Sequence, residues 1–160
     1  MGRMIGSRNN LPEATREKVS QLLNEQVASA IHLQLLAKQA HWNVRGSNFR
    51  SLHKLFDDVF SAATVWADSL AERTAQLGWT VDSTLEFIGA RTNLPPVAAE
   101  LSDGQGLVDG LVKALSTFGA NARKCIEQTE EEGDMATSDL FTEICRGVDE
   151  NLWMVEAHLQ

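Results

Sequence analysis

The sequence predicts an all-α protein, a four-helix bundle in which a short extra helix interrupts the connection between the second and third long helices. Four segments repeat apolar residues at steps of three and four, the spacing of one face of an α-helix. No segment alternates β-branched and polar residues, so nothing indicates a strand. At 160 residues the chain has the size of one domain with a sizeable core.

The first long helix is predicted to begin at residues 10–13, where the letters NLPE place a proline in the first turn and an acidic residue just inside it. Apolar residues then recur every three or four positions as far as about His41. The predicted inward stripe is Val19, Leu23, Val27, Ala30, Leu33 and Ala37. Residues 1–10 are expected to form a flexible tail and residues 11–160 a single domain.

The second long helix follows a break at residues 43–46, and Ser47 is its expected N-cap. It is predicted to run from about Phe49 to Leu77 and to stop at Gly78, because glycine is the commonest residue just beyond a helix C-terminus. This helix carries most of the chemistry-bearing side chains considered below.

A short helix is expected over residues 83–89, which open with the Ser-x-x-Glu spacing of a capping box. The prolines at 95–96 require a loop, after which Ser102 or Asp103 is expected to cap the third long helix. The predicted stripe of that helix is Leu107, Leu111, Leu115, Phe118, Ala122 and Cys125 with Ile126.

The fourth long helix is expected to begin at residues 134–137. Its apolar positions are separated by steps of three or four, which indicates one inward stripe. The predicted stripe is Phe141, Ile144, Val148, Leu152, Val155 and Leu159.

Potential metal ligands share one face of the second long helix. At about 100° per residue, His53, Asp57, Asp68 and Glu72 fall within an arc of about 100°. Imidazole and carboxylate groups suit a divalent transition metal. Asp57 and Asp68 are nevertheless about 16 Å apart along the axis at 1.5 Å per residue, so one helix cannot bring both pairs to one metal.

Two antiparallel copies of this helix can do so. The midpoint of 57 and 68 and the midpoint of 53 and 72 both fall between Ala62 and Ala63, which are small enough to let two helices approach closely. A two-fold axis there would set the His53/Asp57 end of one chain against the Asp68/Glu72 end of the other, twice. The spacing therefore predicts two metal sites across a dimer interface.

Each pair also has a simpler interpretation. His53 and Asp57 could form a surface hydrogen bond at i,i+4, and the repulsion between Asp68 and Glu72 could be relieved by Arg73. Asp58 points about 140° away from His53 and is expected to be solvated.

Composition limits the remaining classes. No run of about 18 apolar residues could span a membrane, and the first residues lack the apolar core of a signal peptide, which favours a cytoplasmic protein. Cys125 and Cys145 are expected to be buried, reduced thiols. The formal charge of −8 disfavours unaided contact with nucleic acid.

The central block of the chain strongly resembles the Dps family, the mini-ferritins also called DNA-protecting proteins of starved cells. The resemblance rests on AHWNVRG at 40–46, on LHKLFD at 52–57 and on DSLAERTAQLG at 68–78, and it extends from about Leu22 to the last helix, where LWMVE occurs at 152–156. The Glu-x-x-His pairs with which other ferritins build a site inside one bundle are absent from the sequence.

The resemblance implies a hollow shell of twelve identical subunits with ferroxidase centres at its two-fold interfaces. His41, His53 and Asp57 match the family's ligands from one subunit, and Asp68 and Glu72 match those from its partner. Each centre is expected to take two iron ions. The expected reaction is oxidation of Fe(II), preferentially by hydrogen peroxide, with storage of ferric mineral and protection of DNA from oxidative damage.

Two further roles are expected from the resemblance. Trp42 is placed to intercept stray oxidising equivalents, with a packing role as the alternative. In the family, an acidic three-fold pore lies near the start of the last helix, and Asp134, Asp139 and Glu143 are the candidates here.

The acidic run at 130–132 is either a solvated charge run or part of an iron-attracting mouth. Accessory metal binding by His32 or His158 is left open.

A second function class is a nucleoid-associated protein that binds and compacts DNA. Family members that bind DNA directly use a lysine-rich terminal tail, whereas the only charges in residues 1–10 are Arg3 and Arg8. Twelve chains of −8 would carry about −96 formal charges, so direct DNA binding is expected to be weak. A helical oligomer without a redox role is the third interpretation.

Overall fold

The computed structural model describes residues 2–97 and 104–160, and this part of the chain is all-helical. Its long helices are α1 (Glu13–Asn43), α2 (Phe49–Gln76), α4 (Gly104–Glu131) and α5 (Met135–Glu156). The short helix α3 (Leu85–Arg91) lies between α2 and α4, and a 3-10 turn, η1 (Ala157–Leu159), follows α5. The predicted fold class is confirmed, including the extra helix in the second connection.

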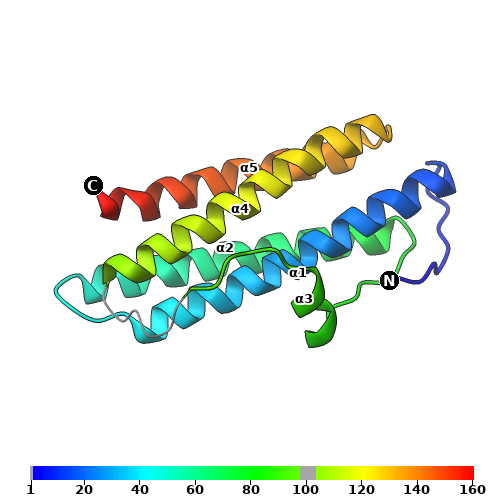
Figure 1. The fold of residues 1–160 in the computed structure, drawn as a ribbon. Coiled ribbons are helices and arrows are strands. Elements are labelled where there is room, and N and C mark those ends of the chain that lie inside the picture. Colours follow the sequence, from blue (N-terminus) through cyan, green and yellow to red (C-terminus); the bar gives the residue numbers. More distant parts are fainter. Residues whose placement is uncertain (1, 98–103) are drawn as a thin grey trace.

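The long helices form two antiparallel hairpins, α1 with α2 and α4 with α5, which pack against each other along the bundle (Figure 1). The chain leaves α2 at one end of the bundle and begins α4 at the other. The connection between them therefore runs the length of the molecule, and α3 lies against α1 outside the bundle. None of the helices described is long and apolar enough to cross a membrane.

The inward stripes of α1 and α4 are buried as predicted, apart from Ile126, which is half-buried. The stripe of α5 is buried from Phe141 to Val148 and again at Val155. The prediction is wrong for Leu159, whose side chain is 39% exposed. The α-helix ends at Glu156 and continues as 3-10 turn, and the tighter winding of that turn rotates Leu159 away from the α-helical stripe.

Helix ends differ from the predictions by one or two residues. Thr84, not Ser83, caps α3, because its hydroxyl accepts a hydrogen bond from the Phe87 amide at 3.2 Å. The N-cap of α2 is Asn48 rather than Ser47, and it makes no side-chain capping bond. The expected caps of the third long helix, Ser102 and Asp103, lie outside the described residues.

The N-terminal residues, expected to form a flexible tail, are bound to the connection after α2. The Ile5 amide donates to the Gly78 carbonyl at 2.9 Å, and the Thr80 amide donates to the Arg3 carbonyl at 2.9 Å. Gly78 has φ +88°, and a side chain there would meet Ser7 Cβ at 2.8 Å. Glycine is therefore required at position 78 both for the left-handed backbone and for this close approach.

Cys125 and Cys145 are free, buried thiols, as predicted. Burial raises the pKa of Cys125 to about 12, so its thiol stays protonated at physiological pH. Burial also raises the pKa of Cys145. Both side chains therefore act as small apolar core residues rather than as reactive groups.

A buried ionic network joins the C-terminal end of α2 to the start of α5. The Asp134 carboxylate, whose side chain is 2% exposed, accepts two hydrogen bonds from the Arg73 guanidinium at 2.9 and 3.1 Å. It also caps α5 by accepting from the Thr137 amide at 3.1 Å and the Thr137 hydroxyl at 2.5 Å. The carboxylate is thus committed to holding two helices together.

Replacing Asp134 by alanine is expected to destabilise the fold by about 3 kcal/mol, because it removes a helix cap and leaves the mostly buried Arg73 guanidinium without its partner. Chemical denaturation followed by circular dichroism would measure the change. The control is Asp149→Ala, which removes an exposed ion pair with Arg123 and should leave the denaturation midpoint nearly unchanged. Equal midpoints for the two variants would contradict this role of Asp134.

Candidate metal centre

Two histidines meet where α1 ends and α2 begins. His41 lies in the last turn of α1, and His53 lies in the second turn of α2. The break at residues 44–48 turns the chain so that the two rings stack, with centroids 3.6 Å apart and planes at 24°. Both side chains are half-buried.

Each histidine is held by the backbone of the other. His41 Nδ1 lies 2.7 Å from the His53 carbonyl, and His53 Nδ1 lies 2.9 Å from the His41 carbonyl. Because a carbonyl oxygen can only accept, both Nδ1 atoms must carry the proton. In the neutral rings the lone pair is then on Nε2, the arrangement typical of histidines that bind a metal.

Asp57 lies one turn beyond His53 on α2, and its carboxylate is paired with Lys38 of α1. The hydrogen bond from Lys38 is the main cause that lowers the pKa of Asp57, and the positive charge of Lys38 adds to it. The Lys38 ammonium also lies over the Phe60 ring, 4.5 Å from its centroid. The hydrogen bond of Asp57 is therefore made with Lys38, and not with His53 as the simpler interpretation suggested.

Asp68 and Glu72 lie further along α2 and are exposed. Arg73, considered above as the cation that could relieve their repulsion, instead binds Asp134 and Thr137. Within residues 2–97 and 104–160 neither Asp68 nor Glu72 forms an ion pair. Two negative charges at i,i+4 repel each other unless a cation lies nearby, so this pair favours the binding of a cation.

The two groups of candidate ligands stay separate within one chain. Among the described residues no three His, Cys, Asp or Glu side chains gather closely enough to hold a metal ion. One group lies at the start of α2 and consists of His53, Asp57 and the neighbouring His41 of α1. The other group lies toward the end of α2 and consists of Asp68 and Glu72. Asp58 is exposed and pairs with Lys54 at 3.0 Å, in agreement with its expected solvation.

Exposed apolar surface surrounds Asp68. A shallow hollow of about 390 Å³ between α1, α2 and the connection after α2 is lined by Asp68 and mainly small or apolar residues. Val65 is 63% exposed at this hollow, and Leu35 of α1 is 53% exposed. Exposed large apolar side chains are common at protein–protein interfaces.

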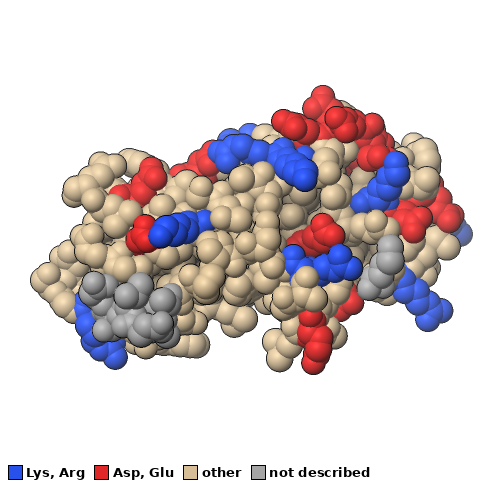
Figure 2. All heavy atoms as spheres, in the orientation of Figure 1, with Lys and Arg blue, Asp and Glu red and all other residues tan. Residues whose placement is uncertain are grey.

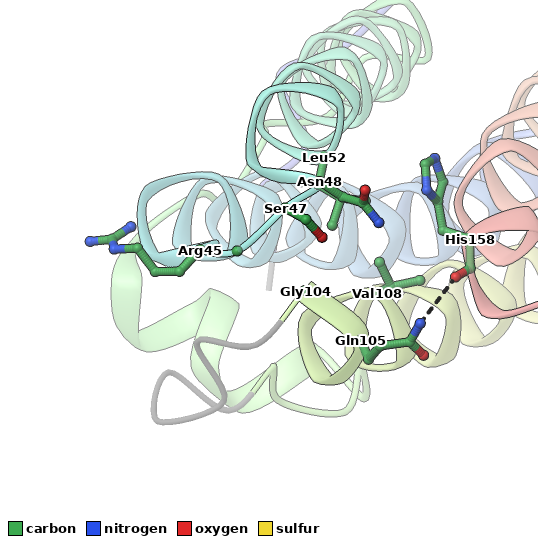
Figure 3. Close-up of a pocket in the computed structure, with 9 residues that line it drawn as sticks. Arg45, Ser47, Asn48, Leu52, Gly104, Gln105, Val108 and His158 are labelled. Carbon is green, nitrogen blue, oxygen red and sulfur yellow. Dashed lines mark hydrogen bonds between the residues drawn. The ribbon is translucent and has the colours of Figure 1, made fainter.

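Another hollow, of about 410 Å³, lies at the end of the bundle where α2 and α4 begin (Figure 3). Gln105 donates to the His158 carbonyl at its edge at 3.5 Å, and Arg45 points away from it. None of its lining residues is a carboxylate. Its chemistry is therefore less suited to iron than the histidine and carboxylate groups on α2.

The remaining candidates differ in their surroundings. Asp134 is buried and hydrogen-bonded to Arg73 and Thr137. Of the three expected pore residues, Asp139 and Glu143 of α5 are therefore the exposed ones. The Trp42 side chain is 64% exposed, so in the single chain it is not a core residue. His32 lies with Nδ1 2.9 Å from the Thr92 hydroxyl, and burial lowers its pKa.

Sequence reasoning missed Lys38. The spacing of the two residues could have indicated it. Lys38 precedes His41 by three residues and therefore lies on the same side of α1, facing the start of α2. A lysine near several candidate ligands is, however, indistinguishable from a solvated lysine until the two helices are placed together.

Comparison with known proteins identifies the family of the chain. The model of the ferritin-like domain matches residues 20–160. The DNA protection during starvation protein of Agrobacterium fabrum is 35% identical over 154 residues, covering 96% of this chain and 95% of that protein. The protein of the same name from Listeria innocua is 33% identical, covering 87% and 90%.

Solved structures show the same fold. Mycobacterium smegmatis Dps superposes with a TM-score of 0.91 at 28% identity, covering 97% of this chain and 94% of that one. Dps from Microbacterium arborescens, solved in a high iron form, gives 0.82 at 32% identity, covering 96% and 97%. The chain is therefore a member of the ferritin-like family, in its Dps branch.

Proposed function

We propose that this protein is a cytoplasmic mini-ferritin that oxidises Fe(II), preferentially with hydrogen peroxide, and stores the ferric product inside a shell of twelve subunits. Its di-iron sites would form across two-fold interfaces, from His41, His53 and Asp57 of one chain and Asp68 and Glu72 of the next. The observation that carries the proposal is the stacked histidine pair, whose Nδ1 atoms donate to backbone carbonyls, which leaves the lone pair of each neutral ring on Nε2. Three of the four carboxylates of α2, those of Asp57, Asp68 and Glu72, are the other proposed ligands.

The chemistry follows from the ligand types. Fe(II) is the substrate, and imidazole and carboxylate groups bind it without excluding the oxidant. Two Fe(II) ions held together can deliver two electrons to one peroxide molecule, so that H₂O₂, two Fe(II) and two protons give two Fe(III) and two water molecules. Because both electrons arrive together, no hydroxyl radical is released. This is how the reaction would protect DNA.

Two neighbouring features support this arrangement. The exposed apolar surface around Val65 provides area that a second chain could bury beside Asp68. At the midpoint of the two ligand groups, Ser61 is exposed and Ala62 is half-buried, and both are small enough to let two copies of α2 approach closely, whereas Ala63 is buried in the core of its own chain. Among the similar proteins, the structure from Microbacterium arborescens is described as a high iron form.

Replacing both His41 and His53 by alanine is expected to slow peroxide-driven oxidation of Fe(II) by at least about 100-fold, because the rings supply two ligands of the site. Ferric absorbance after anaerobic loading with Fe(II) and addition of peroxide measures the rate. His32→Ala, which removes a histidine bonded to Thr92 away from the ligand groups, is the matched control. Equal rates for wild type and the double variant would refute the site.

A mixed-chain experiment is expected to show that each site needs two chains. A chain lacking His41 and His53 and a chain lacking Asp68 and Glu72 are inactive alone. In a mixed two-fold pair, one site has lost both groups of ligands and the other retains both. Co-assembled chains should therefore regain activity approaching half that of wild type per mixed pair, whereas sites within single chains would give none.

The alternative function, direct compaction of DNA, has less support. Arg3 lies in an N-terminal segment whose backbone is bonded to residues 78–80. Figure 2 shows acidic side chains gathered over the turn between α4 and α5, where they would repel phosphate groups. DNA protection would then come from removal of Fe(II) and peroxide rather than from contact.

The assembled protein is expected to leave supercoiled plasmid unshifted in an agarose gel at neutral pH and about 0.1 M salt, because the formal charge of −8 on each chain repels the phosphate groups. A variant with four lysines inserted after Gly2 is the positive control and should retard the plasmid. Tight, metal-independent retardation of plasmid by the wild type would overturn this expectation.

A further inference from the structure

A polar hollow of about 240 Å³ lies on the side of the bundle where α1, α4 and the segment after α3 meet. The described residues that line it include no proposed iron ligand, and all of them except Leu22 and Cys125 are polar. At about 30 Å³ per water molecule, the hollow has room for about eight waters or for one small organic molecule.

Gln26 of α1 is a buried amide without a hydrogen-bond partner. Its side chain lines the hollow and is 8% exposed, and its Oε1 accepts no hydrogen bond from the residues described. The terminal torsion of glutamine is soft, so a half-turn exchanges the oxygen and the nitrogen, and the amide can present either an acceptor or donors to the hollow. Because a buried polar group without a hydrogen bond is destabilising, water or a ligand must supply the missing bond.

Charged groups of both signs surround the hollow. Lys124 of α4 is exposed and forms no ion pair within the part of the chain that the structure describes. Glu25 of α1 is half-buried, and its carboxylate lies 3.5 Å from the Arg91 guanidinium, which is long for a hydrogen bond. The hollow therefore offers a cation to a carboxylate and an anion to an ammonium group.

Side-chain amides complete the polar lining. Asn93 and Asn121 donate to each other at 3.3 and 2.7 Å, and these bonds fasten the segment after α3 to α4. Each of the two amides keeps a second N–H and a second lone pair. Gln128 lies one turn beyond Lys124 on α4 and also lines the hollow. A ligand with a polar side chain could therefore be hydrogen-bonded here.

We propose that this hollow binds a small zwitterionic α-amino acid with a polar side chain. Lys124 binds the carboxylate, and Glu25 and the Gln26 carbonyl oxygen bind the ammonium group. The amides of Asn93 and Asn121 bind the polar side chain. A molecule with positive charges alone would be repelled by the lysine and a molecule with negative charges alone by the glutamate, so a ligand that carries both charges fits best.

The test is a titration of the assembled, metal-free protein with L-asparagine, which has both charges and a side-chain amide, followed by saturation-transfer NMR. A dissociation constant of about 1 mM is expected for so small a ligand. N-acetyl-L-asparagine lacks the ammonium group and L-asparaginamide lacks the carboxylate, so each should bind at least about tenfold more weakly. Absence of binding at about 10 mM L-asparagine, or equal binding of either analogue, would overturn the proposal.

Gln26→Leu replaces the amide by an apolar side chain of similar size. It should weaken the binding of L-asparagine by about tenfold and raise the melting temperature of the ligand-free protein, because a buried amide without a hydrogen bond is removed. If the amide served only the packing of α1, the variant would instead melt at a lower temperature and bind L-asparagine as wild type does. That result would contradict the assignment of Gln26.

Lys124→Met should weaken binding by about fivefold, because the ligand carboxylate loses its cation at an exposed position. This variant also tests the site should Gln26→Leu not assemble. The matched control is Lys113→Met on the same helix, which removes an exposed ion pair with Asp109 away from the hollow and should leave the affinity unchanged. Unchanged affinity in Lys124→Met, or equal losses in the two lysine variants, would refute binding at this hollow.

Discussion

The rigidity of α2 is the constraint on which the site depends. A helix rises 1.5 Å per residue, so the eleven residues from Asp57 to Asp68 separate the two groups of ligands by about 16 Å. No side-chain rotation closes that distance. A second antiparallel copy of the helix does, because the ligand groups are placed symmetrically about Ala62 and Ala63. The proposed metal site can therefore form only if the proposed pairing of two chains also forms.

The fold fixes α2 at both of its ends. At its start, the reciprocal bonds between the His41 and His53 rings and backbones tie it to α1. At its end, Arg73 binds Asp134 and ties it to α5. The proposed ligands are thus carried by a helix that is held at both ends, which would preorganise them for the proposed metal ions.

The acidic side chains fall into groups with separate tasks. Asp134 is buried and structural, and Asp57 is neutralised by Lys38 within the chain. Asp68 and Glu72 stay exposed and without an ion pair in the part of the chain described. Asp57 and Asp58 are paired with lysines, so Asp68 and Glu72 are the carboxylates of α2 that have no ion pair among the described residues, and they are the two proposed to contribute to the partner's site.

The sequence by itself determined the helices, their inward faces and the candidate ligands, because helical periodicity and ligand spacing are local properties of one segment. It also identified the family from the residues around His41 and His53. Only the tertiary structure decided which partner each charged group takes: Arg73 binds Asp134 rather than Glu72, and Lys38 binds Asp57. These choices depend on how helices far apart in sequence are placed together, and spacing along one helix does not contain that information.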